Sequence, residues 1–122
     1  GAIAGSVSHD AHNIVAVGVG DNDICRAISR IIGAGGGLVV VDGRQESLLP
    51  LECAGLMSVR PWEEVDSSLR ELNHHVKRIG GIEDAFMHLS FLALTVIPHL
   101  RITDRGLFDA DAFRDIPVFS GQ

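Results

Sequence analysis

The chain has 122 residues, a formal net charge of −6 at pH 7 and 46% hydrophobic residues. This length fits one domain with a single core, and it excludes a complete metal-dependent barrel enzyme. The negative charge argues against nucleic acid as a partner, because neutralising phosphates requires a basic surface. We expect no membrane partner either, since the sequence has neither the ~18 successive apolar residues of a span nor a basic leader before a hydrophobic segment.

The first third of the chain predicts two strands and a helix. Residues 2–8 and 13–19 are rich in β-branched and small apolar side chains, which is typical of strands. Asp21 is the expected N-cap of a helix that Gly33 ends. Apolar residues recur at helical spacing between them and predict one buried stripe. They are Ile24, Ala27, Ile28, Ile31 and Ile32.

Residues 38–49 carry the strongest hairpin signal in the sequence. The strands are expected at 38–41 and 44–49, around Asp42 and Gly43. Asp-Gly readily adopts the positive φ angles of a tight two-residue turn. The chain therefore contains at least one antiparallel strand pair.

A second helix is predicted from Pro61 onward. Two glutamates follow in its first turn, Lys77 and Arg78 stand in its last turn, and Gly80 follows, as the helix dipole and termination rules require. Its predicted buried stripe consists of Trp62, Val65, Leu69, Leu72, Val76 and Ile79. His74 and His75 are adjacent on this helix, so they cannot form an i, i+4 metal pair, and a solvated face is expected for both.

The remaining sequence is less regular. Residues 83–88 predict a short helix, and the tail 104–122 carries scattered apolar anchors. The apolar run 89–97 predicts a buried central strand or a helix-to-strand segment, ended by Pro98. Together the elements predict an α+β or mixed α/β fold. It comprises a mixed β-sheet with an antiparallel hairpin and two main helices, in a single domain spanning residues 1–122.

A polar cluster separates the first two predicted strands. It contains His9, Asp10, His12 and Asn13 between two apolar runs, and polar residues at a strand junction are a candidate site. Side chains three apart on a strand point to opposite faces, so His9 and His12 converge on one ion only if the chain turns at Asp10 or Ala11. A metal site, a hydrogen-bonded loop or domain interface, and a reach into a neighbouring active site all stay open.

Other candidates are weaker. The glycine-containing stretch 18–23 places Asp21 and Asp23 where a pyrophosphate would need bare amides, so it indicates a helix start. Ser90 lacks the context of a nucleophile elbow. Cys25 and Cys53 lack metal-ligand spacing, which favours reduced thiols packed as small hydrophobic residues in a cytosolic protein, although a disulfide between them stays open.

Four segments, in one order along nearly the whole chain, carry a resemblance. They are residues 8–13, 35–41, 49–58 and 87–107. In these segments the chain resembles the C-terminal domain of bacterial adenine deaminase, a member of the amidohydrolase superfamily. Ala11 and Thr95 depart from the residues usual in that family, but the His, Asp and Asn residues of the first segment match.

The resemblance implies a cytoplasmic, metal-dependent hydrolase of purine salvage that converts adenine to hypoxanthine and ammonia. The binuclear iron or manganese centre would lie in a barrel domain of the same polypeptide, and no metal ligand is assigned to this chain. This segment would support the barrel active site or a homo-oligomer contact. His9, Asp10 and His12 would be accessory catalytic residues, and Asn13 and Ser90 would contact the substrate. The alternative is a non-catalytic structural or interaction module.

Overall fold

The computed structural model describes residues 1–9 and 11–119. Seven strands and three helices are present in this part of the chain. In chain order they are β1 (Ala2–Gly5), β2 (Val15–Gly18), α1 (Asp21–Ala34), β3 (Gly37–Asp42), β4 (Gln45–Pro50), α2 (Trp62–Arg78), α3 (Ala85–Ser90), β5 (Leu100–Thr103), β6 (Gly106–Asp109) and β7 (Arg114–Ile116).

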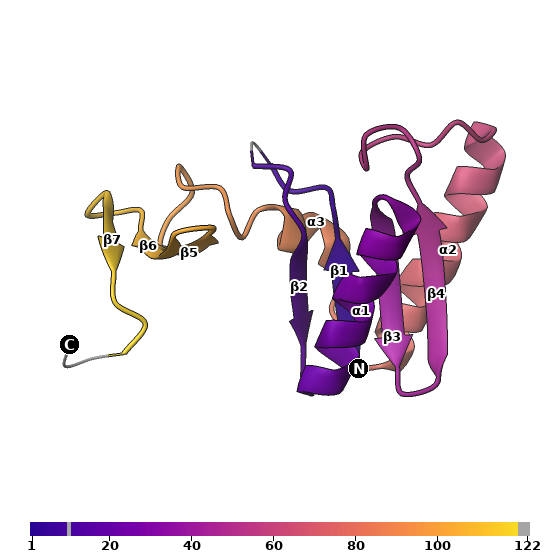
Figure 1. Ribbon diagram of the computed structural model, residues 1–122, viewed down its shortest axis with the longest axis horizontal. Coiled ribbons are helices and arrows are strands. Elements are labelled where there is room, and N and C mark those ends of the chain that lie inside the picture. The colour runs from indigo at the N-terminus through magenta and orange to yellow at the C-terminus, as the bar shows by residue number, and fades with distance from the viewer. Residues whose placement is uncertain (10, 120–122) are drawn as a thin grey trace.

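A four-stranded sheet of order β2-β1-β3-β4 forms the centre of the main lobe (Figure 1). Each neighbouring pair is antiparallel, with Ala4 opposite both Ala16 and Val39. Helix α1 packs on one face of this sheet, whereas α2 and α3 pack on the other. The α+β fold with an antiparallel hairpin and two main helices is thereby confirmed.

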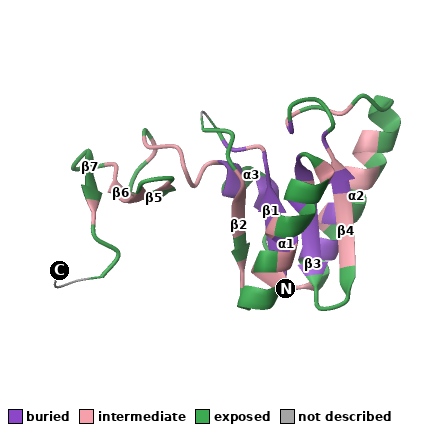
Figure 2. Cartoon of the chain, viewed as in Figure 1, coloured by how far each residue is buried: buried purple, intermediate pink, exposed green. Residues whose placement is uncertain are grey.

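Successive residues of the central strands enter two different cores. Ile3 and Val40 contact the side of α2 and α3, whereas Ala4, Val39 and Val41 contact the side of α1. Because both faces of the sheet are covered, β3 has consecutive apolar residues at positions 38–41 instead of an alternating pattern. Figure 2 shows the resulting band of buried residues through β1 and β3.

Helix α1 differs from its prediction at both ends. Gly20 is the N-cap and makes no side-chain cap, so Asp21 is the first helical residue and not the cap. The helix continues past Gly33 and ends at Gly35, whose φ of 73° is readily available to glycine. Ile32 is 64% exposed because it lies beyond the edge of the buried stripe.

The predicted hairpin is confirmed, with a shift of one residue in its loop. Asp42 pairs with Gln45, so the two loop residues are Gly43 and Arg44. Gly43 has a φ of +54°, which matches the conformation that its tight turn requires.

The buried stripe of α2 is narrower than the predicted stripe and is rotated about the helix axis. Leu72 and Val76 are buried as expected, but Trp62, in the first turn, is 73% exposed. His75, expected on a solvated face, is only 2% exposed. It lies on the side that faces β4, where its Nδ1 is 2.9 Å from Ser47 Oγ.

Residues 89–97 contain no strand, so the predicted central strand is wrong, and of the alternative helix-to-strand segment only the helical start is present. The helix α3 extends through Leu89 and Ser90, which are buried, and the chain then proceeds through turns toward Pro98. The sheet centre is already occupied by β1 and β3, so this apolar run instead covers the edge of the core and leads out of the main lobe.

The tail forms a second antiparallel sheet of order β5-β6-β7. It stands beside the main lobe and is joined to it through the segment that follows α3 (Figure 1). A backbone hydrogen bond of 3.0 Å from Ile102 N–H to Leu92 C=O ties its first strand to this segment.

Cys25 and Cys53 are both exposed free thiols, so the expectation that they pack as buried hydrophobic residues was wrong. Each lies on an outward side, Cys25 on α1 and Cys53 in the loop after β4. Among the helices of residues 1–9 and 11–119, none has the length and apolar character required to cross a membrane.

Candidate functional site

The polar cluster lies in the loop that joins β1 to β2, as its position between two apolar runs predicts. His12 N–H donates a hydrogen bond of 2.8 Å to Ser8 C=O, and His12 itself has a φ of +44°. The chain therefore turns within the cluster, so the His9 and His12 side chains are not held on opposite faces of a strand. Asp10 lies outside the described residues.

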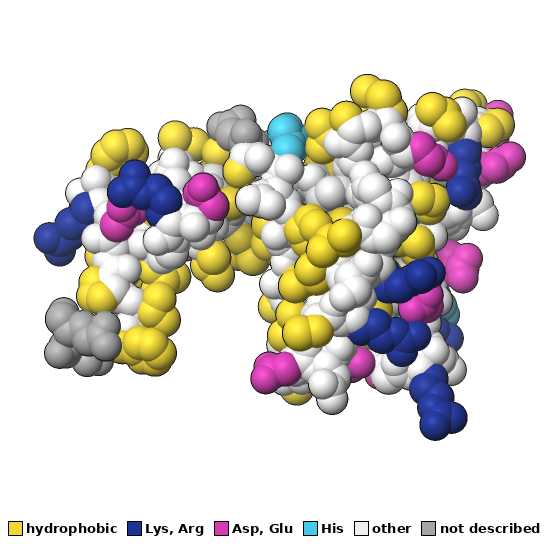
Figure 3. Space-filling view, viewed as in Figure 1, with side chains coloured by type: hydrophobic (Ala, Val, Ile, Leu, Met, Phe, Trp, Pro, Cys, Tyr) yellow, Lys and Arg dark blue, Asp and Glu magenta, His cyan; other side chains and the backbone are white. Residues whose placement is uncertain are grey.

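His9 is held against the end of α3. Its imidazole stacks on Phe91, with ring centroids 4.5 Å apart and an interplanar angle of 15°. Its backbone N–H donates a 2.9 Å hydrogen bond to Ser90 C=O. The side chain remains exposed, so the ring is fixed in orientation while accessible from outside. Figure 3 shows a histidine side chain exposed at this end of the main lobe.

His9 and Ser90 also share a cavity of about 390 Å³. Helix α2 contributes Asn73 to it, and Asp84 enters from the turn before α3. The other lining residues are apolar: Val7, Leu38, Leu69, Phe86 and Met87. We call this space the His9 cavity. Its apolar walls with a few polar groups resemble the general composition of small-molecule sites.

Ser90 contributes mainly its backbone to this arrangement. Its side chain is 4% exposed, and its Oγ donates a 2.7 Å hydrogen bond to Met87 C=O within the helix. The hydroxyl is thus engaged in α3, whereas the carbonyl fixes His9.

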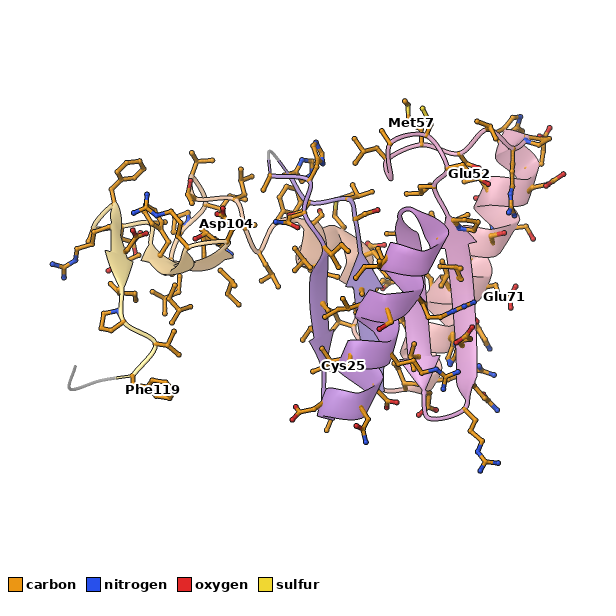
Figure 4. All side chains as sticks on the ribbon, viewed as in Figure 1. Cys25, Glu52, Met57, Glu71, Asp104 and Phe119 are labelled. Carbon is orange, nitrogen blue, oxygen red and sulfur yellow. The ribbon has the colours of Figure 1, made fainter. Side chains whose placement is uncertain are left out.

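Asn13 lies on a different cavity from His9. It lines a space of about 370 Å³ between the start of β2, the segment after α3 and β5, where Thr95, Thr103 and Asp104 supply further polar groups. Figure 4 shows Asp104 where the small sheet approaches the main lobe. The Asn13 Oδ1 accepts a 2.9 Å hydrogen bond from Ile14 N–H, which fixes the entry to β2.

The described residues do not bring together three or more His, Cys, Asp or Glu side chains in a group that could hold a metal ion. This part of the chain therefore does not fit the binuclear centre that the resemblance implies for the barrel. What the loop presents instead is a stacked imidazole, an apolar cavity beside it and a second, more polar cavity on its other side.

Three residues around His9 were not singled out from the sequence. Phe91 lies in a uniformly apolar run, and nothing in that run distinguishes it from its neighbours. Asp84 becomes part of the cavity only through its turn, where it has a φ of +50°. Asn73 could have been found, because it lies four residues after Leu69 and three before Val76 on the buried side of the predicted helix.

The chain matches a known protein family. Residues 1–114 match the model of the adenine deaminase C-terminal domain. The chain belongs to this adenine deaminase C-terminal domain family. The match spans both cavities and nearly the whole tail sheet, and it confirms the family resemblance found in the sequence.

Relatives of this family include proteins from archaea and bacteria. The chain is 60% identical over 119 residues to the adenine deaminase of Methanoculleus marisnigri and 62% identical over 119 residues to that of Methanoregula boonei. It is 52% identical over 115 residues to the adenine deaminase of Brucella abortus. These alignments cover 98%, 98% and 93% of this chain but only 23%, 21% and 20% of the relatives. The chain thus spans about a fifth of the length of the curated relatives it matches.

Proposed function

We propose that this chain is the C-terminal part of an adenine deaminase that hydrolyses adenine to hypoxanthine and ammonia in the cytoplasm. The observation that carries the proposal is the family match over residues 1–114, together with relatives named adenine deaminase that align with 93–98% of the chain. The family resemblance implies a binuclear iron or manganese centre, which we assign to a barrel in the remaining polypeptide.

Within that enzyme, we assign the β1–β2 loop to the closure of the adenine pocket. Hydrolysis adds water at the carbon that bears the amino group, and the departing nitrogen takes up a proton to leave as ammonia. An imidazole can donate and accept protons near neutral pH, so an exposed and oriented histidine suits such a transfer. His9 meets this description because Phe91 and Ser90 fix its ring and backbone.

His12 and Asn13 belong to the same proposal with different roles. His12 is exposed on the turn and is assigned to contact with the neighbouring domain, whereas Asn13 shapes the loop through Ile14. Asp10 stands in the same sequence cluster and is included as an accessory residue on its sequence position alone.

The test is ammonia release from adenine by the full-length protein purified with iron or manganese. Turnover that a chelator abolishes and added metal restores supports the assignment. A full-length protein without turnover under these conditions, but with bound metal, would refute it.

A structural or interaction module is the second candidate function. The exposed hydrophobic side chains of the tail favour it, since Leu100 and Ile102 are 55% and 57% exposed. It predicts that replacing His9 or His12 leaves turnover of the full-length enzyme intact and changes only stability or assembly.

A further inference from the structure

The tail sheet has one aliphatic face. Residues directly opposite in an antiparallel pair project to the same side of a sheet. The register places Ile102 opposite Leu107 and Leu107 opposite Ile116, and Leu100 lies two residues before Ile102 on the same side. We call Leu100, Ile102, Leu107 and Ile116 the aliphatic face.

The opposite face of this sheet carries side-chain contacts within the tail. Phe113 packs edge-to-face on Phe108 with ring centroids 5.3 Å apart. Arg105 forms a 2.7 Å ion pair with Asp115, which is opposite Phe108 in the register. These contacts lie within the tail, although Phe113 itself is 73% exposed.

The aliphatic face is largely open. Leu100 and Ile102 are more than half exposed, and Leu107 and Ile116 are only partly buried. Figure 3 shows hydrophobic side chains gathered along the underside of this part of the chain. Because a small sheet gains its stability by burying its apolar face against another layer, this face requires a partner.

Charge and size indicate which partner fits. The charged residues on this face are Asp109 and Arg114, which stand opposite each other in the register and have opposite signs. A neutral apolar surface therefore fits better than a polyanion. A stable dimer needs roughly 800 Å² from each copy, far more than four partly buried aliphatic side chains supply. A domain tethered in the same polypeptide needs less area, because the tether raises its effective concentration.

We propose that the aliphatic face docks on the remainder of the same polypeptide, the part that makes up about four fifths of the relatives' length. This inference rests on the proposed function, which assigns a barrel to that remainder. Docking there would hold the tail sheet in place and fix the position of the second cavity, to which Ile102, Thr103 and Asp104 contribute.

Photo-crosslinking in the full-length protein tests this docking. A photoreactive phenylalanine analogue is placed at position 102 on the aliphatic face and, as a matched control, at position 113 on the opposite face. We expect crosslinks within one polypeptide from position 102 to residues outside the present chain, at least several-fold more abundant than those from position 113. Crosslinks only between two copies, equal yields at both positions, or none at position 102 would overturn the proposal.

Substitution gives a second, independent measurement. Ile102→Asp in the full-length protein should raise the rate of protease cleavage within residues 97–119 about tenfold, while Ile102→Val should leave it near the wild-type rate. Equal rates for both variants and the wild type would count against docking. Ammonia release by the wild type is assayed on the same preparation. Activity without crosslinks refutes the docking alone, whereas crosslinks without activity refute the proposed function alone.

Discussion

Ser47 on β4 and His75 on α2 are joined across the core by a 2.9 Å hydrogen bond between Ser47 Oγ and His75 Nδ1. His75 Nε2 is buried and has no hydrogen-bond partner among the described residues. Burial lowers the pKa of His75 below 6.5, and Arg78 lowers it further, against the opposing effect of Asp42 and Glu71. The folded protein therefore holds this ring in its neutral form.

This relationship predicts acid sensitivity. Because the pKa of His75 is lower in the folded state than in the unfolded state, the unfolded state binds the proton more readily. The stability contributed by the neutral ring is therefore fully present above about pH 6.5, and it is lost as the pH falls through the folded pKa. We expect His75→Leu to reduce the change in melting temperature between pH 7 and pH 5, measured by circular dichroism. His74→Leu, on the exposed side of α2, is the control and should retain the wild-type slope. A wild-type slope in His75→Leu would contradict the prediction.

Two buried serines of the first segment should respond differently to alanine. Ser6 Oγ accepts a 2.8 Å hydrogen bond from Gly37 N–H and donates one of 2.5 Å to Gly55 C=O, whereas Ser8 Oγ has no partner within the described part of the chain. Ser6→Ala should reduce the free energy of unfolding by ~1–3 kcal/mol, because it leaves buried backbone groups unpaired. Ser8→Ala should change it by less than ~0.5 kcal/mol. Urea denaturation of both variants measures the two changes in the free energy of unfolding. Equal changes would show that the Ser6 hydrogen bonds do not stabilise the contact with Gly37 and Gly55.

The burial of α2 predicts a graded loss of stability. Leu72 is 1% exposed, so Leu72→Ala should cost ~2–5 kcal/mol through lost contacts and a residual cavity. Leu69 is only half-buried beside the His9 cavity, and its replacement by alanine should cost less. The two variants are compared by their denaturant midpoints, at an unchanged dependence of the free energy of unfolding on denaturant concentration. A larger effect at Leu69 than at Leu72 would mean that another part of the protein covers Leu69.

The stacked imidazole predicts a catalytic effect that is separable from stability. His9→Ala in the full-length enzyme should reduce turnover of adenine ~100-fold at unchanged metal content and melting temperature if the ring transfers a proton. His9→Phe retains the stacking on Phe91 and is the matched control, so it should lose turnover equally. Recovery of turnover in His9→Phe would assign His9 to packing alone, and unchanged turnover in His9→Ala would remove it from the reaction.

Local pattern was sufficient for several elements. The hairpin around Gly43, the helical spacing after Pro61 and the glycine after α2 each depend on neighbours in sequence. Each is present, the hairpin with its loop shifted by one residue. The polar cluster was also correctly located between two strands. The separation of His9 and Asn13 into two cavities was not predictable, because the residues that complete those cavities belong to α2, α3 and β5.

The failed predictions share a tertiary cause. The uniform apolar character of residues 89–97 fits a central strand, yet β1 takes the central place between β2 and β3. His75 is polar by type, but its position three residues after Leu72 places it on the buried side, where Ser47 supplies one partner. For residues 89–97 the deciding neighbours are remote in sequence. For His75 the helical spacing allowed a buried position, and only the partner Ser47, remote in sequence, shows how its polar ring is accommodated.

The strand order of the central sheet has a consequence for how the chain folds. β3 and β4 are adjacent in sequence, and so are β1 and β2, whereas the seam between β1 and β3 joins two pairs separated by α1. Contacts between near neighbours close with the smaller loss of chain entropy, so we expect both hairpins to precede the seam. In stopped-flow experiments, Gly43→Ala in the β3–β4 loop should mainly slow refolding. Ile31→Val, in the α1 core that joins residues of β1 and β3, should mainly accelerate unfolding. The strand that begins the sequence would then be the one whose pairing completes the sheet.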